Sequence, residues 1–352
     1  MHRPMMRIKV TFVVAALAGL ICLAAMIAAG PENPVPPAPA AGDKIKIGPK
    51  PAGKIAFINE GDIWIMDADG RNRQKVCDID NARGRMSFSP DNKRIVFTRE
   101  GKDGSNLPSG EGGAHLLHDL FIAYLDSAAT NSNWWTRLTK GLGGAYPEWS
   151  YDGAKIYYQN DINAGMVDYL VPTHQIAVVD ANGANSEYLR KDWQRLNMSM
   201  LLPAVSRDGQ KIAFVINYSS DPERYTFQNF GIKIMNLADI MAAEPEMRKP
   251  SPGLREGYAP SWSPDNQWLA FVSNDMRNQG IFIIHPDLTG KRLIYAPPAT
   301  AQVSAAPVGW SPDSRWIVFA ISDGTIYTID INGENLTPLT GSGIISNPAW
   351  SK

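Results

Sequence analysis

A short motif that joins two β-rich segments through a tight turn recurs along this chain, and it constrains the fold more than any other feature. Its clearest copy is residues 262–266 (WSPDN), followed by residues 268–271 (WLAF). Proline fixes φ, aspartate and asparagine favour tight turns, and the aromatic and aliphatic residues on either side favour strands. Each copy therefore predicts one β-hairpin.

Six copies of this hairpin motif can be located by the serine that precedes the turn. These serines are Ser89, Ser150, Ser206, Ser263, Ser311 and Ser351. The spacing between consecutive serines falls from roughly 60 to about 40 residues, which is in the range of propeller and solenoid repeats. The chain is therefore expected to consist of repeated β-sheets packed side by side.

The two ends of the repeat region complement each other. Residues 53–57 have the pattern of a second strand without a first strand, and residues 348–352 have the pattern of a first strand without a second. Joined, they would form one blade and close the ring without an open edge strand. The sequence thus predicts an all-β fold over residues 53–352: a six-bladed β-propeller of four-stranded antiparallel blades, closed by N- and C-terminal strands that share one blade.

The motif Trp-Ser-Pro-Asp-Gly/Asn, followed by Ile-Ala-Phe, resembles the TolB-like, PD40 (WD40-like) β-propeller repeat over residues 53–352. The resemblance implies an architecture and no particular activity, because these residues build blades. TolB carries an additional N-terminal α/β domain that we do not find in this sequence, so its Tol–Pal role is not expected here. Some PD40-like propellers are lyases that act on uronic-acid sugars through a histidine-bound metal, and this implies an enzymatic alternative.

The first 52 residues differ in composition from the rest of the chain. Basic residues precede an uncharged segment, residues 10–29, that is long enough to span a bilayer, and residues 28–30 (AAG) resemble a cleavage site. Residues 1–30 are therefore a signal peptide or an N-terminal membrane anchor, and residues 31–52 are a Pro/Ala-rich linker. Either alternative places the propeller outside the cytoplasm, in the periplasm or at the cell exterior, with membrane contact only through residues 10–29.

Long insertions in three consecutive blades predict where a ligand would bind. The links between the second and third strands are long at residues 99–118, 160–174 and 217–231, and short in blades 5 and 6. Because strands alternate in direction, all three insertions share one face, opposite the Ser-Pro-Asp turns. We call these the looped face and the turn face. The candidate binding residues on the looped face are His115, His118, Asp119, Asp161, Asp168, Tyr169, His174, Trp193, Arg195, Arg224 and Tyr225.

Two kinds of chemistry are compatible with these residues. The histidines His115, His118 and His174 with a nearby carboxylate could bind zinc or another transition metal, although scattered surface histidines give the same spacing. The tyrosines, tryptophan and arginines suit a protein partner or an acidic sugar. No Gly-x-Ser-x-Gly nucleophile motif occurs.

We therefore predict a non-catalytic binding or scaffold protein, without a cofactor, that recognises a protein, peptide or glycan of the cell envelope. The alternative is a metal-assisted lyase or hydrolase acting on an acidic polysaccharide, and a third possibility is a ring whose insertions bind nothing. The formal net charge of −1 at pH 7 gives no indication of nucleic-acid binding. Since both ends of the propeller region lie at the turn face, the looped face is expected to point away from the membrane.

Overall fold

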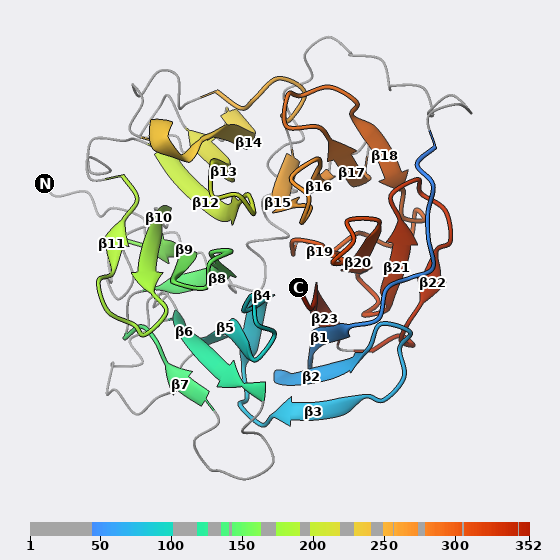
Figure 1. Ribbon diagram of the computed structural model, residues 1–352, viewed down its shortest axis with the longest axis horizontal. Helices are drawn as coiled ribbons and strands as arrows, with labels where there is room; N and C mark the ends of the chain where they lie inside the picture. The colour runs from blue at the N-terminus through green and yellow to red at the C-terminus, as the bar shows by residue number, and fades with distance from the viewer. Residues whose placement is uncertain are drawn as a thin grey trace, which may run out of the picture.

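The described strands form a ring of six antiparallel sheets around a central axis (Figure 1). The computed structural model describes residues 44–100, 118–125, 135–140, 143–162, 174–190, 198–218, 229–240, 249–255, 257–273, 279–304, 306–343 and 345–352. Residues 1–43, which contain the predicted leader and most of the predicted linker, lie outside this part of the chain. The predicted six-bladed β-propeller is confirmed.

The strands of each blade follow one another in the sequence, except in blade 1. Blade 1 contains β23 (Ile345–Trp350), β1 (Lys54–Asn59), β2 (Asp62–Asp67) and β3 (Gln74–Cys77). Blade 2 contains β4 (Ala82–Phe88), β5 (Arg94–Glu100), β6 (His118–Tyr124) and β7 (Trp135–Arg137). Blade 3 contains β8 (Gly144–Trp149), β9 (Lys155–Asp161), β10 (His174–Asp180) and β11 (Glu187–Tyr188).

The other three blades repeat this order. Blade 4 contains β12 (Met198–Val205), β13 (Lys211–Tyr218) and β14 (Asn229–Asn236). Blade 5 contains β15 (Gly257–Trp262), β16 (Leu269–Ser273), β17 (Gly280–Ile284) and β18 (Arg292–Tyr295), and blade 6 contains β19 (Gly309–Trp310), β20 (Trp316–Ala320), β21 (Ile326–Asp330) and β22 (Thr337–Pro338). In blade 4 a described segment at Ser251–Leu254 takes the place of a fourth strand, because its backbone bonds to Ile232 on β14.

The ring closes through blade 1, where the last strand of the chain pairs with the first. In the antiparallel register of β23 and β1, Trp350 lies opposite Ile55 and Ala349 opposite Ala56. The backbone N–H of Ser351 donates to the carbonyl of Lys54 at 2.8 Å, which continues the pairing beyond the strand. The predicted closure is therefore confirmed.

The repeated serine and aspartate hold each turn between the first two strands. In blade 5 the hydroxyl of Ser263 accepts a hydrogen bond from the N–H of Trp268 at 2.9 Å and donates to Asp265 at 2.6 Å. The same Ser-to-Asp bond occurs in blades 2, 3, 4 and 6, at Ser89–Asp91, Ser150–Asp152, Ser206–Asp208 and Ser311–Asp313. The motif is thus a structural device, as the sequence predicted, and it marks the turn face of every blade but the first.

An aromatic side chain on the second strand of each blade fills the space between neighbouring blades. These side chains are almost completely buried, as expected for the core of stacked sheets. They are Phe57, Phe97, Tyr158, Phe214, Phe271 and Phe319.

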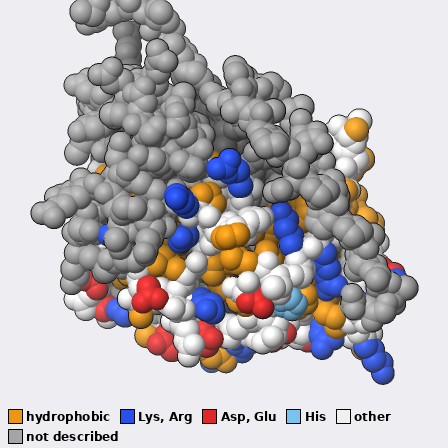
Figure 2. Space-filling view, turned by 90° about the horizontal axis from the view of Figure 1, so that it is seen from above, with side chains coloured by type: hydrophobic (Ala, Val, Ile, Leu, Met, Phe, Trp, Pro, Cys, Tyr) orange, Lys and Arg blue, Asp and Glu red, His pale blue; other side chains and the backbone are white. Residues whose placement is uncertain are grey.

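The outer edge of the ring exposes apolar side chains beside lysine and arginine (Figure 2). On blade 5 the ammonium of Lys291 lies 5.0 Å from the ring centre of Phe282, and the guanidinium of Arg292 lies 4.8 Å from that of Trp268. Such contacts cover aromatic surface while keeping the charge near water.

Each of five inner strands contains an irregularity in its pairing. The register with the neighbouring strand shifts in β4, β8, β12, β15 and β23. At the same place the backbone has a positive φ, at Gly84 (65°), Tyr146 (52°), Leu202 (51°), Ala259 (53°) and Asn347 (53°). A β-bulge redirects the side chains that follow it. The bulges therefore decide which residues reach the centre of the ring.

The end of the predicted linker lies against blade 6 on the turn face. The N–H of Ile45 donates to the side-chain oxygen of Asn332 at 3.0 Å, and the Asn332 amide donates back to the Ile45 carbonyl at 2.7 Å. Arg315 donates to the carbonyl of Lys46 at 2.7 Å, and Ile47 packs against the core. Within the part of the chain that the structure describes, no helix is long and apolar enough to cross a membrane.

Candidate functional site

Four of the predicted binding residues belong to the described part of the chain. His118 begins β6, Asp119 follows it, Asp161 ends β9, and His174 begins β10. They lie where the strands of blades 2 and 3 meet the looped face. The remaining predicted residues lie outside the described residues: His115, Asp168, Tyr169, Trp193, Arg195, Arg224 and Tyr225.

His118 is placed among charged groups of two adjacent blades. It lies opposite Glu100 in the pairing of β5 and β6, and Asp161 of blade 3 is close enough to influence its charge. Its Nδ1 atom is buried and has no hydrogen-bond partner among the described residues. Burial lowers the pKa of His118, and the Arg83 guanidinium lowers it further, whereas Glu100, Asp161 and Asp119 oppose this. The imidazole is therefore held neutral at physiological pH.

Asp119 forms contacts inside blade 2 that hold the edge strand. Its carboxylate is ion-paired with Arg137 on β7 and accepts a hydrogen bond from the hydroxyl of Thr139 at 3.1 Å. The Thr139 hydroxyl in turn accepts from the N–H of Leu120 at 2.9 Å. Asp119 thus links β6 to the edge of the blade, which is a structural role.

Only one group of three potential metal ligands occurs among the described residues, and it lies on the looped face of blade 1, outside the predicted surface of blades 2–4. Asp62, Asp78 and Asp80 of blade 1 bring their ligand atoms within 4.8 Å of one another. The ammonium of Lys75 lies 2.8 Å from Asp62 and 3.3 Å from Asp78, so it offsets part of their negative charge. The described members of the predicted histidine site, His118 and His174, do not belong to such a group, and His115 is outside the described residues.

The central hairpins of blades 2, 3 and 4 extend further on the looped face than those of blades 5 and 6. Their second strands end eleven or twelve residues after the repeat serine, at Glu100, Asp161 and Tyr218. In blades 5 and 6 the second strand ends ten and nine residues after that serine, at Ser273 and Ala320. At roughly 3.3 Å per residue this difference raises one side of the ring by about 3–10 Å. The three predicted insertions therefore begin from a raised arc.

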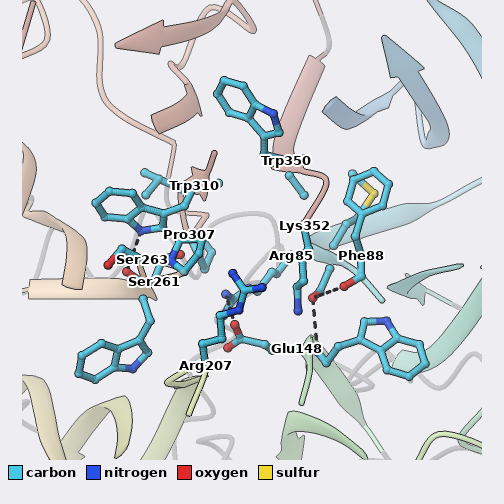
Figure 3. A pocket seen from close by; sticks show the side chains of 18 of the residues that line it. Arg85, Phe88, Glu148, Arg207, Ser261, Ser263, Pro307, Trp310, Trp350 and Lys352 are labelled. Atoms are coloured by element: carbon cyan, nitrogen blue, oxygen red, sulfur yellow. Dashed lines mark hydrogen bonds and ion pairs between the residues drawn. The ribbon is translucent and has the colours of Figure 1, made fainter. Parts of the chain in front are cut away.

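A second candidate site lies at the centre of the ring, on the turn face. A cavity of about 110 Å³ is lined by the inner strands of all six blades and by the residues at their turns. The charged side chains of Arg85, Glu148, Arg207 and Lys352 point into it (Figure 3). We call this cavity the central pocket.

One ion pair crosses the floor of the central pocket. Arg85 of blade 2 lies 3.0 Å from the Glu148 carboxylate of blade 3 and donates to the carbonyl of Pro203 in blade 4 at 3.0 Å. Glu148 also accepts a hydrogen bond from the N–H of Val205 at 3.2 Å. Both side chains are largely buried, with 9% and 13% of their surface exposed. The pair therefore ties three blades together.

Two further cations of the pocket are not part of this ion pair. Arg207 stacks on Tyr151, 4.2 Å from the ring centre, and donates to its hydroxyl at 2.9 Å. Burial lowers the pKa of Lys352 to about 8, Arg85 and Arg207 contribute to this decrease, and Glu148 opposes it. The main chain of Lys352 is bonded to the side chain of Asn92, so its ammonium is the group directed at the pocket.

Four tryptophans form the walls of the pocket without offering it an open face. Trp149, Trp262, Trp310 and Trp350 are each at most 7% exposed. The indole N–H of Trp262 donates to the carbonyl of Ala204, and that of Trp310 to the carbonyl of Ser261, both at 3.0 Å. Trp262 and Trp310 therefore fasten each blade to the preceding one.

The central pocket was not predicted, although the repeat contains a signal for it. The residue after the repeat serine is proline in three blades, and in the others it is Tyr151, Arg207 or Lys352. Two residues before that serine, five blades have serine, alanine or glycine, and one has Glu148. The departures from the repeat are thus the residues that give the pocket its charge and its exposed aromatic ring.

The ring of six antiparallel sheets defines the chain as a six-bladed β-propeller. No family model matches the sequence, and no curated protein matches it, so the PD40 repeat assignment stays a prediction. Among solved structures, the chain is similar to TolB from Acinetobacter baumannii, with a TM-score of 0.58 and 15% identity over 85% of this chain and 66% of that one. The match thus spans slightly less than two thirds of the Acinetobacter protein.

Two other structures show the same architecture. One, from Agrobacterium tumefaciens and assigned as TolB, has a TM-score of 0.55 and 16% identity over 85% of this chain and 99% of that one. The other is a chain of the nidogen/laminin complex, with a TM-score of 0.55 and 10% identity over 85% of this chain and 98% of that one. At these identities the similarity shows the fold alone.

Proposed function

We propose that this protein is a non-catalytic binding or scaffold module located outside the cytoplasm. It recognises a protein, peptide or glycan of the cell envelope through the looped face of blades 2–4. The observation that carries the proposal is the raised arc of hairpins on three consecutive blades, each of which leads into a predicted insertion. Binding residues are commonly placed on loops that a rigid scaffold positions.

The described base of this surface has the composition of a recognition site. Glu100, His118 and Asp161 lie together at the junction of blades 2 and 3, where burial lowers the pKa of His118 and its Nδ1 has no hydrogen-bond partner among the described residues. Polar groups of this kind give specificity when a ligand completes their hydrogen bonds. The predicted insertions would add the aromatic and arginine side chains that dominate binding energy in many interfaces.

The proposed location rests on the first 52 residues of the sequence. A signal peptide or anchor in residues 1–30 would deliver the propeller to the periplasm or cell exterior, and residues 31–52 would act as a tether. The described residues at the end of this tether lie on the turn face of blade 6. This supports an orientation in which the looped face points away from the membrane.

Replacement of the insertions tests the proposed surface. The short link of blade 5, residues 274–279, is grafted in place of residues 101–117, 163–173 or 219–228, one at a time. Partners that the wild-type protein retains from an envelope extract should be lost with at least one graft, while the thermal unfolding midpoint stays close to that of the wild type. If a well-folded triple graft still recovers the same partners, the looped face is not the recognition surface.

The enzymatic alternative makes a different prediction about metal content. A metal-assisted lyase or hydrolase would contain a stoichiometric metal that depends on the histidines His115, His118 and His174. Metal analysis of the purified protein and of the three His→Ala variants separates the two functions. Stoichiometric metal that disappears in the variants would contradict the scaffold function.

A further inference from the structure

The central pocket opens on the turn face, and its chemistry is independent of the looped face. We propose that the central pocket binds a carboxylate group presented by a protein partner, either an Asp or Glu side chain or a C-terminal carboxylate. The proposal therefore goes beyond the function assigned to the looped face and does not rest on it.

The balance of charge in the pocket favours an anion. Three cationic side chains, those of Arg85, Arg207 and Lys352, point into the cavity together with one anionic side chain, that of Glu148. Glu148 is already engaged by Arg85 and by the N–H of Val205. Arg207 and Lys352 thus remain to form charge-assisted hydrogen bonds, which are stronger than bonds between neutral groups.

The size of the pocket limits what it can admit. Cavities that hold whole small ligands usually measure about 300–1,000 Å³, whereas the central pocket measures about 110 Å³. Only the terminal group of a larger ligand fits into this space. A carboxylate on a short chain satisfies this limit.

The walls and rim favour a protein over a glycan. The tryptophan side chains that line the pocket are buried against neighbouring blades, so they present no open face on which a sugar ring could stack. At the rim, Tyr151 is 47% exposed and is held in place by Arg207. Tyrosine and arginine are enriched among the residues that dominate protein–protein binding energy.

The position of Lys352 makes binding sensitive to pH. Burial and the neighbouring guanidinium groups of Arg85 and Arg207 lower the pKa of Lys352 to about 8, whereas the Glu148 carboxylate opposes this decrease. A bound carboxylate stabilises the ammonium form and so raises this pKa in the complex. The affinity is therefore expected to be constant below about pH 8 and to decrease as the pH rises above it.

The test uses short peptides as probes and NMR detection of the tryptophan indoles. The peptides are acetyl-Gly-Asp-Gly-amide, its Asn analogue, and acetyl-Gly-Gly-Gly with a free C-terminal carboxylate or as the amide. We expect the two carboxylate peptides to shift the indole signals in a saturable manner and the neutral peptides to have no effect. The carboxylate peptide that binds more tightly shows whether the pocket prefers an Asp side chain or a C-terminal carboxylate.

Variants assign the binding to the pocket. Arg207→Gln and Lys352→Met should each lower the affinity for the carboxylate peptides about tenfold, which is the loss expected for one charged hydrogen bond. Lys140→Met, which removes an exposed lysine elsewhere, should leave the affinity unchanged, and thermal unfolding verifies that each variant is folded. Lys352→Arg should keep the affinity but abolish its decrease above pH 8.

Three results would overturn the proposal. The first is equal binding of the Asp and Asn peptides. The second is unchanged affinity in both folded pocket variants. The third is tighter binding of galacturonate than of either carboxylate peptide, which would assign the pocket to an acidic sugar. Since the grafts on the looped face leave the pocket intact, failure of one proposal is distinguishable from failure of the other.

Discussion

The contribution of an individual charged residue to the stability of the propeller depends on how deeply the residue is buried. The pair Arg85–Glu148 is almost withdrawn from solvent and bonds to three blades. The pair Lys54–Asp67 on blade 1 is at a similar contact distance but is 47% and 31% exposed. Buried and exposed pairs of the same charge type therefore occur in one molecule and can be compared directly.

Removal of Arg85 is expected to destabilise the protein strongly. Arg85→Met leaves the Glu148 carboxylate buried without its counter-charge, which typically costs about 3–5 kcal/mol. Lys54→Met should cost less than about 1 kcal/mol, because that pair is screened by solvent. Urea unfolding of the two variants measures the difference.

The double variant Arg85→Met/Glu148→Leu separates the charge from the packing. It should recover a large part of the stability lost in Arg85→Met, since replacing both members of a buried pair by apolar groups is often neutral. If the single and double variants unfold at the same urea concentration, the uncompensated charge is not the cause.

At the scale of secondary-structure elements, the sequence predicted the hairpins and the closure of the ring. The repeat serine and aspartate act locally, through bonds within about five residues, so their pattern can be recognised without tertiary information. The bulges at Tyr146 and Leu202 were not predicted. A positive φ at bulky residues is unusual, and it arises where six inner strands converge around one channel.

The closing strand β23 is expected to be the most sensitive element of the ring. Trp350 belongs to the hydrophobic cluster between blades 1 and 6 and is 4% exposed. Trp350→Ala should cost about 3–5 kcal/mol, as for other large-to-small changes in a core. It should also accelerate amide hydrogen exchange in β1, because β1 keeps β2 but loses its other partner strand when β23 detaches.

Trp262→Ala is the matched control for this prediction. Trp262 occupies the same repeat position in blade 5 and is similarly buried. Unlike in blade 1, all four strands of blade 5 follow one another along the chain. Trp262→Ala should lower the free energy of unfolding without a selective acceleration of amide hydrogen exchange in β1. Equal exchange patterns in the two variants would show that closure through blade 1 is not a weak point.

At the scale of the whole molecule, the two candidate sites lie on opposite faces of one ring of sheets. A candidate surface on the looped face could be proposed from the sequence alone, because insertions between regular repeats are visible there, and it stays a prediction. The central pocket could not, since Arg85, Glu148, Arg207 and Lys352 come from four blades and meet only when the ring closes. The same convergence explains why one residue per blade is enough to build a charged site.

On the two proposals above, this arrangement suits a module that contacts two components at once. The turn face carries residues 45–47 on blade 6 and the central pocket, whereas the looped face carries the raised arc of blades 2–4.

The most direct test of the proposed recognition surface is photo-crosslinking from two positions on the looped face. A photoreactive amino acid replaces Ile162, next to the blade 3 insertion, or Asp323, in the short link of blade 6. The account predicts that a partner retained by the wild-type protein crosslinks to position 162 and not to position 323. Crosslinks at position 323 alone, or equally at both, would contradict recognition by the raised arc.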